Sequence, residues 1–477
     1  MNNNDNGGIT STIKELKEAF VTGHVGTSEY ELLLVCLSSP IGIWLYHELM
    51  LLLPSRVSSI RIRIVLECMV LVLPMLLCQT KWLYPWGILL LGFNCILSFA
   101  LCIRRKSKGN NETAMNKQQQ DITTSSYNNN NYDVIVTYYR STVMYLTFIA
   151  ILAVDFNIFP RRFAKTETIG CGLMDLGAGS FVVAAGITSS KKTIFFGKKT
   201  IKKMLPLLAL GMIRLLTTKG IEYQEHVTEY GIHWNFFFTL AFLSPIATIL
   251  SSSSWIVLLL SSYQFLLSYY NVQNFIETAP RRCTTTSYYC INFFVANREG
   301  ILGLIGYTFI YITAQYISQI TSIFATNNDS EKQRRQYTTT TTKLGITSIF
   351  LWLVHIVLVY ILKIPVSRRS TNASFCVWTL AHNITVLWLV SLVNYQKNNN
   401  NPPVLEVFHT VNRHGLLAFL IANLLTGFVN LSVGNTLETS DTMAFVILMI
   451  YLFSIAAIVV VFDNYYPKKS QNQKKNK

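Results

Sequence analysis

One stretch of the chain sets ionisable side chains against a long apolar run. The run ends at Asp155, and Pro160 follows it; proline ends a helix because it lacks an amide hydrogen and clashes with the preceding turn. Three cations come next, at Arg161, Arg162 and Lys165. Ionisable groups beside membrane-length apolar segments are energetically costly, so they indicate a functional site. A partly desolvated carboxylate is a stronger base than one in water, and arginines suit phosphate groups.

A second apolar run follows, rich in small residues, and it carries Asp175. A carboxylate inside such a run is a second candidate for chemistry. Close helix packing is the competing explanation for the glycines around it.

Other segments also place polar side chains at or inside apolar runs. The candidate substrate-binding residues before two such runs are His233, Trp234, Asn235, Asn297, Arg298 and Glu299. Further polar groups lie at 367–372, 382–383 and 423–430. Each has a simpler interpretation, as an interfacial aromatic anchor, a surface ion pair or a hydrogen bond between helices. Taken singly, none identifies a substrate contact.

The composition indicates what kind of protein must position these residues. The 477-residue chain is 51% hydrophobic and 13% charged, whereas soluble domains are about a quarter charged. Together with the long apolar runs, this predicts an all-α polytopic membrane protein, since helices satisfy their backbone groups within the segment. The formal net charge is +16. The cations lie in short loops between apolar runs, which is the orientation signal of membrane insertion and not the signature of a nucleic-acid surface.

We predict about 13 transmembrane helices. They lie near 31–53, 61–79, 82–103, 134–155, 170–188, 201–217, 233–250, 253–270, 301–321, 344–363, 374–395, 408–432 and 442–462. An odd number of spans puts the termini on opposite sides, and most loop cations fall on the side of the C-terminus. The sequence therefore predicts a lumenal N-terminus and a cytosolic C-terminus. Cations at 161–165, 281–298 and 368–369 fall on the lumenal side, where phosphate binding and the statistical nature of the rule are the two explanations.

We expect residues 31–462 to form a single polytopic domain. The flanking and inserted segments are a lumenal amphipathic segment at 1–30, a low-complexity cytosolic insert at 106–132, a Thr-rich loop at 325–343 and a basic cytosolic tail at 463–477. The polar inserts bury too little apolar area to fold. Lys474 and Lys475 match the dilysine signal that retains membrane proteins in the endoplasmic reticulum.

Three motifs carry a resemblance to a known family. They read FPRRFAKTE at 159–167, LMDLGAGSF at 173–181 and GIHWNFFFT at 231–239. With the polar segments described above, in the same order, they resemble the inositol acyltransferases of glycosylphosphatidylinositol (GPI) anchor synthesis, the PIG-W type, also known as the GPI-anchored wall transfer protein family. The resemblance runs from about residue 17 to residue 431, excluding the two inserts. Its departures, Ala178 and Arg298, remove no presumed catalytic group.

This resemblance implies transfer of a fatty acyl group from acyl-CoA, as co-substrate, to the inositol ring of glucosaminyl-phosphatidylinositol in the endoplasmic reticulum membrane. Such a reaction needs a base near the hydroxyl and positive charge where the thioester oxygen becomes negative. We expect Asp155 to take the hydroxyl proton, and Lys165 to stabilise the oxyanion or to hold Asp155 ionised. Arg161 and Arg162 are then expected to bind phosphate of the lipid or of the coenzyme. Asp175 with His233 is the alternative catalytic pair.

Other functional classes fit less well. A polytopic lipid or solute transporter is the alternative that composition alone favours, although the two halves show no convincing repeat. None of the eight histidines begins a His-x4-Asp motif, and no phosphate-binding loop motif occurs. The nine cysteines show neither paired spacing nor zinc-ligand spacing. We therefore expect no metal cofactor, no disulfide framework and no nucleic-acid partner.

Overall fold

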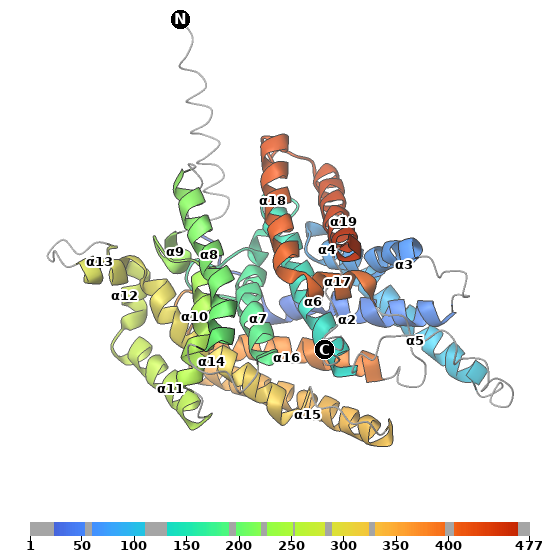
Figure 1. The fold of residues 1–477 in the computed structure, drawn as a ribbon, viewed down its shortest axis with the longest axis horizontal. Helices are drawn as coiled ribbons and strands as arrows, with labels where there is room; N and C mark the ends of the chain where they lie inside the picture. The colour runs from blue at the N-terminus through green and yellow to red at the C-terminus, as the bar shows by residue number, and fades with distance from the viewer. Residues whose placement is uncertain are drawn as a thin grey trace, which may run out of the picture. The chain divides into compact units, whose positions relative to one another are not determined.

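The computed structural model describes residues 23–52, 60–109, 131–189, 197–220, 227–250, 253–281, 289–323, 330–395 and 405–465. The regular secondary structure of these residues is helical, apart from an isolated bridge between Thr27 and Cys171, and turns and irregular segments connect the helices (Figure 1). The prediction of an all-α fold is confirmed. Most of the predicted N-terminal segment, most of the insert and nearly all of the basic tail lie outside the described residues.

Within these ranges, eight helices are long and apolar enough to cross a membrane. They are α2 (Glu29–Leu52), α5 (Trp86–Gly109), α6 (Asn131–Ala153), α14 (Arg298–Ile320), α15 (Ser330–Ile356) with η5 (Val357–Ile361), α16 (Ala373–Tyr395), α18 (Gly415–Val433) and α19 (Asp441–Tyr465). Three apolar helices are shorter, namely α7 (Leu173–Ile187), α10 (Phe236–Ile249) and α11 (Ser253–Tyr269). The prediction of a polytopic membrane protein is confirmed.

The two remaining predicted spans are also helical, but they are interrupted or basic. Residues 61–79 form α3 (Ile60–Glu67), the π-helix η2 (Cys68–Val72) and α4 (Leu73–Cys78) in succession. Residues 201–217 lie in α8 (Lys198–Gly220), which carries several lysines and Pro206. Short helices complete the described chain: α9 (Val227–Tyr230), α12 (Val272–Thr278), α13 (Tyr289–Ala296) and α17 (Glu406–Arg413).

The chain divides into two compact units, each assembled from separate stretches. Unit 1 comprises Met1–Glu29, Arg161–Phe324 and Thr339–Thr385, and unit 2 comprises Tyr30–Pro160, Ala325–Thr338 and Val386–Lys477. Neither unit is a contiguous stretch of sequence. The single polytopic domain that we expected at 31–462 stays a prediction.

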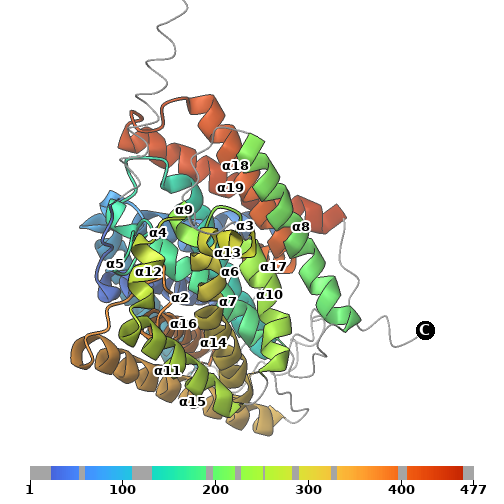
Figure 2. The same ribbon diagram turned by 90° about the vertical axis from the view of Figure 1, so that its left-hand side faces the viewer.

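In unit 1, α14 is the central helix. It packs against α7, α10 and α11, and α10 packs in turn against α8 (Figures 1 and 2). The approach of α7 to α14 depends on a missing side chain, because a Cβ at Gly186 would lie 2.4 Å from the carbonyl oxygen of Tyr311. Small residues allow such backbone contact between membrane helices. Packing against α14 therefore explains the glycine at position 186 of this run.

In unit 2, α6 packs against α17, α18 and α19. The fully buried carboxylate of Glu67 accepts hydrogen bonds from the backbone N–H groups of Val407 (3.1 Å) and Phe408 (2.9 Å). These donors belong to the first turn of α17, where helix amides have no partner within the helix and favour negative charge. Glu67 therefore fixes the start of α17.

The prediction of a Thr-rich loop at 325–343 is wrong from Ser330 onward, because α15 begins there. Two of the threonines, Thr340 and Thr341, are buried, and the Thr340 hydroxyl donates to the carbonyl oxygen of Thr321 at 2.8 Å, whereas Thr338, Thr339 and Thr342 are exposed on the helix. A threonine whose hydroxyl finds an acceptor and whose methyl group is buried is compatible with a helix.

Replacing Gly186 by leucine is expected to destabilise the protein by about 1–3 kcal/mol, because the added side chain would push α7 away from α14. The thermal denaturation midpoint of the purified chain in detergent measures this effect. The matched control is Gly92→Leu in α5, where an added Cβ meets nothing within 4 Å. Equal midpoints for the two variants would contradict the packing argument.

Candidate functional site

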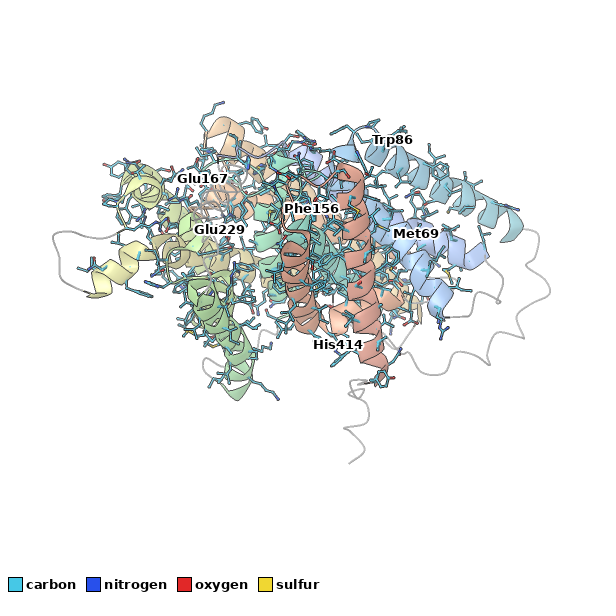
Figure 3. All side chains as sticks on the ribbon, turned by 90° about the horizontal axis from the view of Figure 1, so that it is seen from above. Met69, Trp86, Phe156, Glu167, Glu229 and His414 are labelled. Atoms are coloured by element: carbon cyan, nitrogen blue, oxygen red, sulfur yellow. The ribbon has the colours of Figure 1, made fainter. Side chains whose placement is uncertain are left out.

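Lys165 lies between the short 3-10 turn η4 (Arg161–Phe163) and the start of α7. Its ammonium group forms an ion pair with the carboxylate of Glu229 in α9, which Figure 3 labels. The Lys165 side chain is 37% exposed, whereas that of Glu229 is only 13% exposed. The pair thus joins a carboxylate that is mostly shielded from solvent to a more accessible cation. Glu229 is not among the candidate residues that the sequence indicated, because it lies outside the apolar runs and 64 residues from Lys165.

Asp175 anchors the residue that follows Lys165. Its Oδ2 atom accepts hydrogen bonds from the backbone N–H of Thr166 (2.9 Å) and from the Thr166 hydroxyl (2.8 Å). Its Oδ1 atom lies 2.5 Å from Nε of Arg368. Asp175 is fully buried. Its carboxylate is therefore committed to holding the Lys165 segment and to neutralising Arg368.

Arg368 contacts both segments that carry the Lys165–Glu229 pair. It pairs with Asp175, and its guanidinium lies 5.7 Å from the ring centroid of Tyr230, the residue after Glu229. Burial is the largest single effect and lowers the pKa of Arg368, but the neighbouring Asp175 carboxylate together with Tyr230, Glu229 and Tyr307 outweighs it, so the net pKa lies above its usual value. Burial raises the pKa of the Tyr230 phenol, because it disfavours the charged phenolate. Arg368 therefore stays cationic and links the two segments.

The loop before α16 reinforces this arrangement. Its Val366 carbonyl oxygen accepts from the N–H of Gly170 (2.8 Å), and the Ser367 hydroxyl donates to the carbonyl oxygen of Thr168 (2.7 Å). Asn372 is buried, donates to the carbonyl oxygen of Pro365 (2.7 Å) and accepts from backbone N–H groups. The loop is thus tied to the segment between Lys165 and α7.

A second charged cluster surrounds Glu299 at the start of α14. Arg281 donates to both Glu299 oxygens, at 2.8 and 3.2 Å, and Arg369 donates to one of them at 3.2 Å. Arg298 directs its guanidinium to backbone carbonyl oxygens, which are those of Ile276 (3.0 Å), Ala279 (2.7 Å), Val295 (3.2 Å) and Pro280 (3.5 Å). Two of these carbonyls lie at the C-terminal end of α12, where a cation is favourable.

The aromatic motif before α10 makes hydrogen bonds within unit 1. Asn235 caps α10, accepting from the N–H groups of Phe237 and Phe238 and donating to the carbonyl oxygen of Gly211. Trp234 donates from its indole nitrogen to the Thr239 hydroxyl at 3.0 Å. Asn235 thereby has an architectural role, in addition to any contact with substrate.

The structure brings two predicted site residues, His233 and Asn297, into contact. Oδ1 of Asn297 accepts from the backbone N–H of His233 at 2.7 Å, and the His233 ring stacks on Phe293. Asn297 is fully buried. This contact joins the segment before α10 to the start of α14.

Asp155 belongs to unit 2 and lies two residues beyond the end of α6. Its Oδ2 atom accepts a hydrogen bond from the side-chain amide of Asn430 in α18 at 2.7 Å. Asp155 and Lys165 fall in different units, so their joint action stays a prediction. Arg161 is half-buried, and Arg162 is exposed with its guanidinium 5.1 Å from the Phe163 ring.

Metal ligation has no candidate among the described residues, where no group of three or more His, Cys, Asp or Glu side chains could hold an ion. The arrangement instead offers carboxylates, an accessible ammonium group and arginines. These groups suit proton transfer and stabilisation of a developing oxyanion.

Comparison with known proteins identifies relatives of the chain. The GWT1 family model matches residues 13–462. "GPI-anchored wall transfer protein 1" of Yarrowia lipolytica is 38% identical over 351 residues, covering 68% of this chain and 71% of the relative. The proteins of the same name from Kluyveromyces lactis (34% identical; 96% of this chain, 98% of the relative) and Saccharomyces cerevisiae (33%; 94% and 98%) match over nearly their whole lengths.

Replacing Asp175 by asparagine is expected to destabilise the protein by about 3–5 kcal/mol, because Arg368 would be left as an uncompensated buried charge. The double variant Asp175→Leu/Arg368→Met removes both charges, so it is expected to recover most of that loss. The measurement is the thermal denaturation midpoint of each purified variant. A double variant no more stable than Asp175→Asn would show that the pair is not the origin of the effect.

Proposed function

The chain belongs to the GWT1 family, the inositol acyltransferases of GPI-anchor biosynthesis, and we propose that it transfers a fatty acyl group from acyl-CoA to the inositol ring of glucosaminyl-phosphatidylinositol. Family membership favours this enzyme over the transporter alternative. The observation that carries the proposal in the structure is the buried support of the Lys165 segment by Asp175 and Arg368. A costly ion pair next to an accessible lysine fits the preorganisation that oxyanion stabilisation requires.

In the proposed reaction, Asp155 accepts the proton of the inositol hydroxyl. The hydroxyl oxygen forms a bond with the thioester carbon, and Lys165 stabilises the negative charge that develops on the thioester oxygen. The carbon–sulfur bond then breaks, and coenzyme A takes the proton from Asp155 as it leaves as a thiol. The side-chain amide of Asn430 orients Asp155 and favours its charged form, and Glu229 orients Lys165.

We also propose substrate contacts for the other polar residues that the sequence singled out. Arg161 and Arg162 meet phosphate groups, since guanidinium matches phosphate geometry. The remaining proposed contacts are Asp175, His233, Trp234, Asn235, Asn297, Arg298 and Glu299. For those with committed hydrogen bonds, we propose that the contribution is to shape the site.

We also propose that the protein resides in the endoplasmic reticulum membrane, with a lumenal N-terminus and a cytosolic C-terminus. The uneven distribution of loop cations supports this orientation. Protease added to sealed microsomes is expected to remove a C-terminal tag and to leave an N-terminal tag protected. Protection of the C-terminal tag would reverse the orientation.

Replacing Asp155 by asparagine or Lys165 by methionine is expected to lower kcat by about 10²–10⁴-fold, because each change removes one catalytic group at nearly constant volume. The kcat of the double variant is expected to be only slightly lower than that of the less active single variant, because the effects of groups that act together are not additive. The assay measures transfer of the labelled acyl group from acyl-CoA to glucosaminyl-phosphatidylinositol, with equal amounts of each purified protein. Near-normal turnover of the Asp155→Asn variant would transfer the base assignment to Asp175 and His233.

A further inference from the structure

In the described part of unit 1, one cluster of buried and half-buried arginines has fewer carboxylate partners than guanidinium groups. Arg368 is matched by Asp175, and Arg298 is satisfied by backbone carbonyl oxygens that include the end of α12. Arg281 and Arg369, however, share the single carboxylate of Glu299, whose side chain is fully buried. A buried charge without a counter-charge is costly, so two guanidinium groups on one carboxylate leave a place for a further anion.

The surplus charge is accessible on one side. The Arg281 side chain is 22% exposed, while that of Arg369 is 7% exposed. The Nε–H of Arg369 is buried and meets no acceptor among the residues that the structure describes, although its Nη2 donates to Glu299 and, at 3.4 Å, to the carbonyl oxygen of Ile276. A buried N–H group with no acceptor costs about 1–3 kcal/mol. An anion with several oxygens would remove both the charge surplus and this unpaired donor.

We propose that Arg281 and Arg369 bind the phosphodiester group of the inositol phospholipid substrate. A phosphate group has the charge and the multiple acceptor oxygens that the cluster lacks, and arginine binds it through parallel N–H donors. Arg369 directly follows Arg368, which holds the Lys165 segment through Asp175. This inference rests on the proposed function, because it assigns a contact to one substrate of that reaction.

Coenzyme A also carries phosphate groups, so the test must separate the two substrates. In the Arg281→Gln variant, the KM for glucosaminyl-phosphatidylinositol is expected to rise about 10- to 100-fold, as befits loss of a charge-assisted hydrogen bond. The KM for acyl-CoA and kcat are expected to change less than about twofold. The Arg281→Lys variant keeps the charge but lacks the paired donors. Its KM for glucosaminyl-phosphatidylinositol is expected to lie between those of wild type and Arg281→Gln.

The matched control is Arg413→Gln in unit 2. Arg413 is also 22% exposed and also binds both oxygens of one carboxylate, that of Asp463 (3.0 and 2.8 Å). This variant is expected to leave the KM for the lipid unchanged. A rise equal to that of Arg281→Gln would trace the effect to general destabilisation and overturn the inference.

A binding measurement separates failure of the inference from failure of the proposed reaction. Dioctanoyl phosphatidylinositol is expected to raise the thermal denaturation midpoint of wild type and of Arg413→Gln, but not of Arg281→Gln. Equal stabilisation of all three proteins would overturn the lipid assignment even if acyl transfer is observed. A higher KM for acyl-CoA in Arg281→Gln would assign the cluster to the coenzyme instead. If wild type transfers no acyl group, the proposed function fails, while the stabilisation measurement still decides the phosphate site.

Discussion

The buried ion pair between Asp175 and Arg368 is the interaction on which the architecture of unit 1 depends. Removing two ions from water costs several kcal/mol per ion, and their attraction repays this only when further hydrogen bonds satisfy them. Here the second carboxylate oxygen is satisfied by both donors of Thr166, and the guanidinium lies over the ring of Tyr230. The desolvation cost of Asp175 and Arg368 is therefore offset only while these contacts keep their positions. If either charge is removed, the other is left buried without a counter-charge. The two segments that carry Lys165 and Glu229 then lose the contacts that Asp175 makes to Thr166 and that Arg368 makes to Tyr230.

The polar groups of unit 1 follow one physical rule. Each buried charge is placed where a helix begins or where a loop crosses between helices, because free backbone groups occur there. Arg298 uses the carbonyl oxygens around the end of α12, Asn235 uses the free N–H groups of α10, and Glu299 at the start of α14 receives two arginines. The helix interiors also bury polar side chains, such as His382 and Asn383 in α16, while small residues such as Gly186 allow close contact between α7 and α14. A membrane protein can in this way hold many charges without exposing them to lipid.

The sequence was sufficient to predict the helical segments, because length and hydropathy alone identify spans. It also singled out Asp175 and the residues around Lys165, since charges stand out against apolar runs. It could not predict the partners. Arg368 is far from Asp175 in sequence, and Glu229 is far from Lys165, and no periodicity encodes such pairings. The prediction of a Thr-rich loop failed for a related reason. The burial of Thr340 in α15 depends on an acceptor, the carbonyl oxygen of Thr321, which only the folded chain supplies.

The hydrogen bonds of the polar residues distinguish those that hold the fold from those that can still contact a substrate. A side chain whose donors and acceptors are already committed inside the protein cannot bind substrate without breaking those bonds, and each broken buried bond carries a desolvation cost. Asn235 and Arg298 are in that position. Lys165 and Arg281 differ, because each pairs with a carboxylate that is less exposed than the cation, and its own side chain is partly open to its surroundings. An ionic partner that orients a group without enclosing it is the arrangement expected of a residue that must meet a substrate. This distinction is the reason why we propose substrate contacts for the accessible cations of unit 1 and a supporting role for its buried charges.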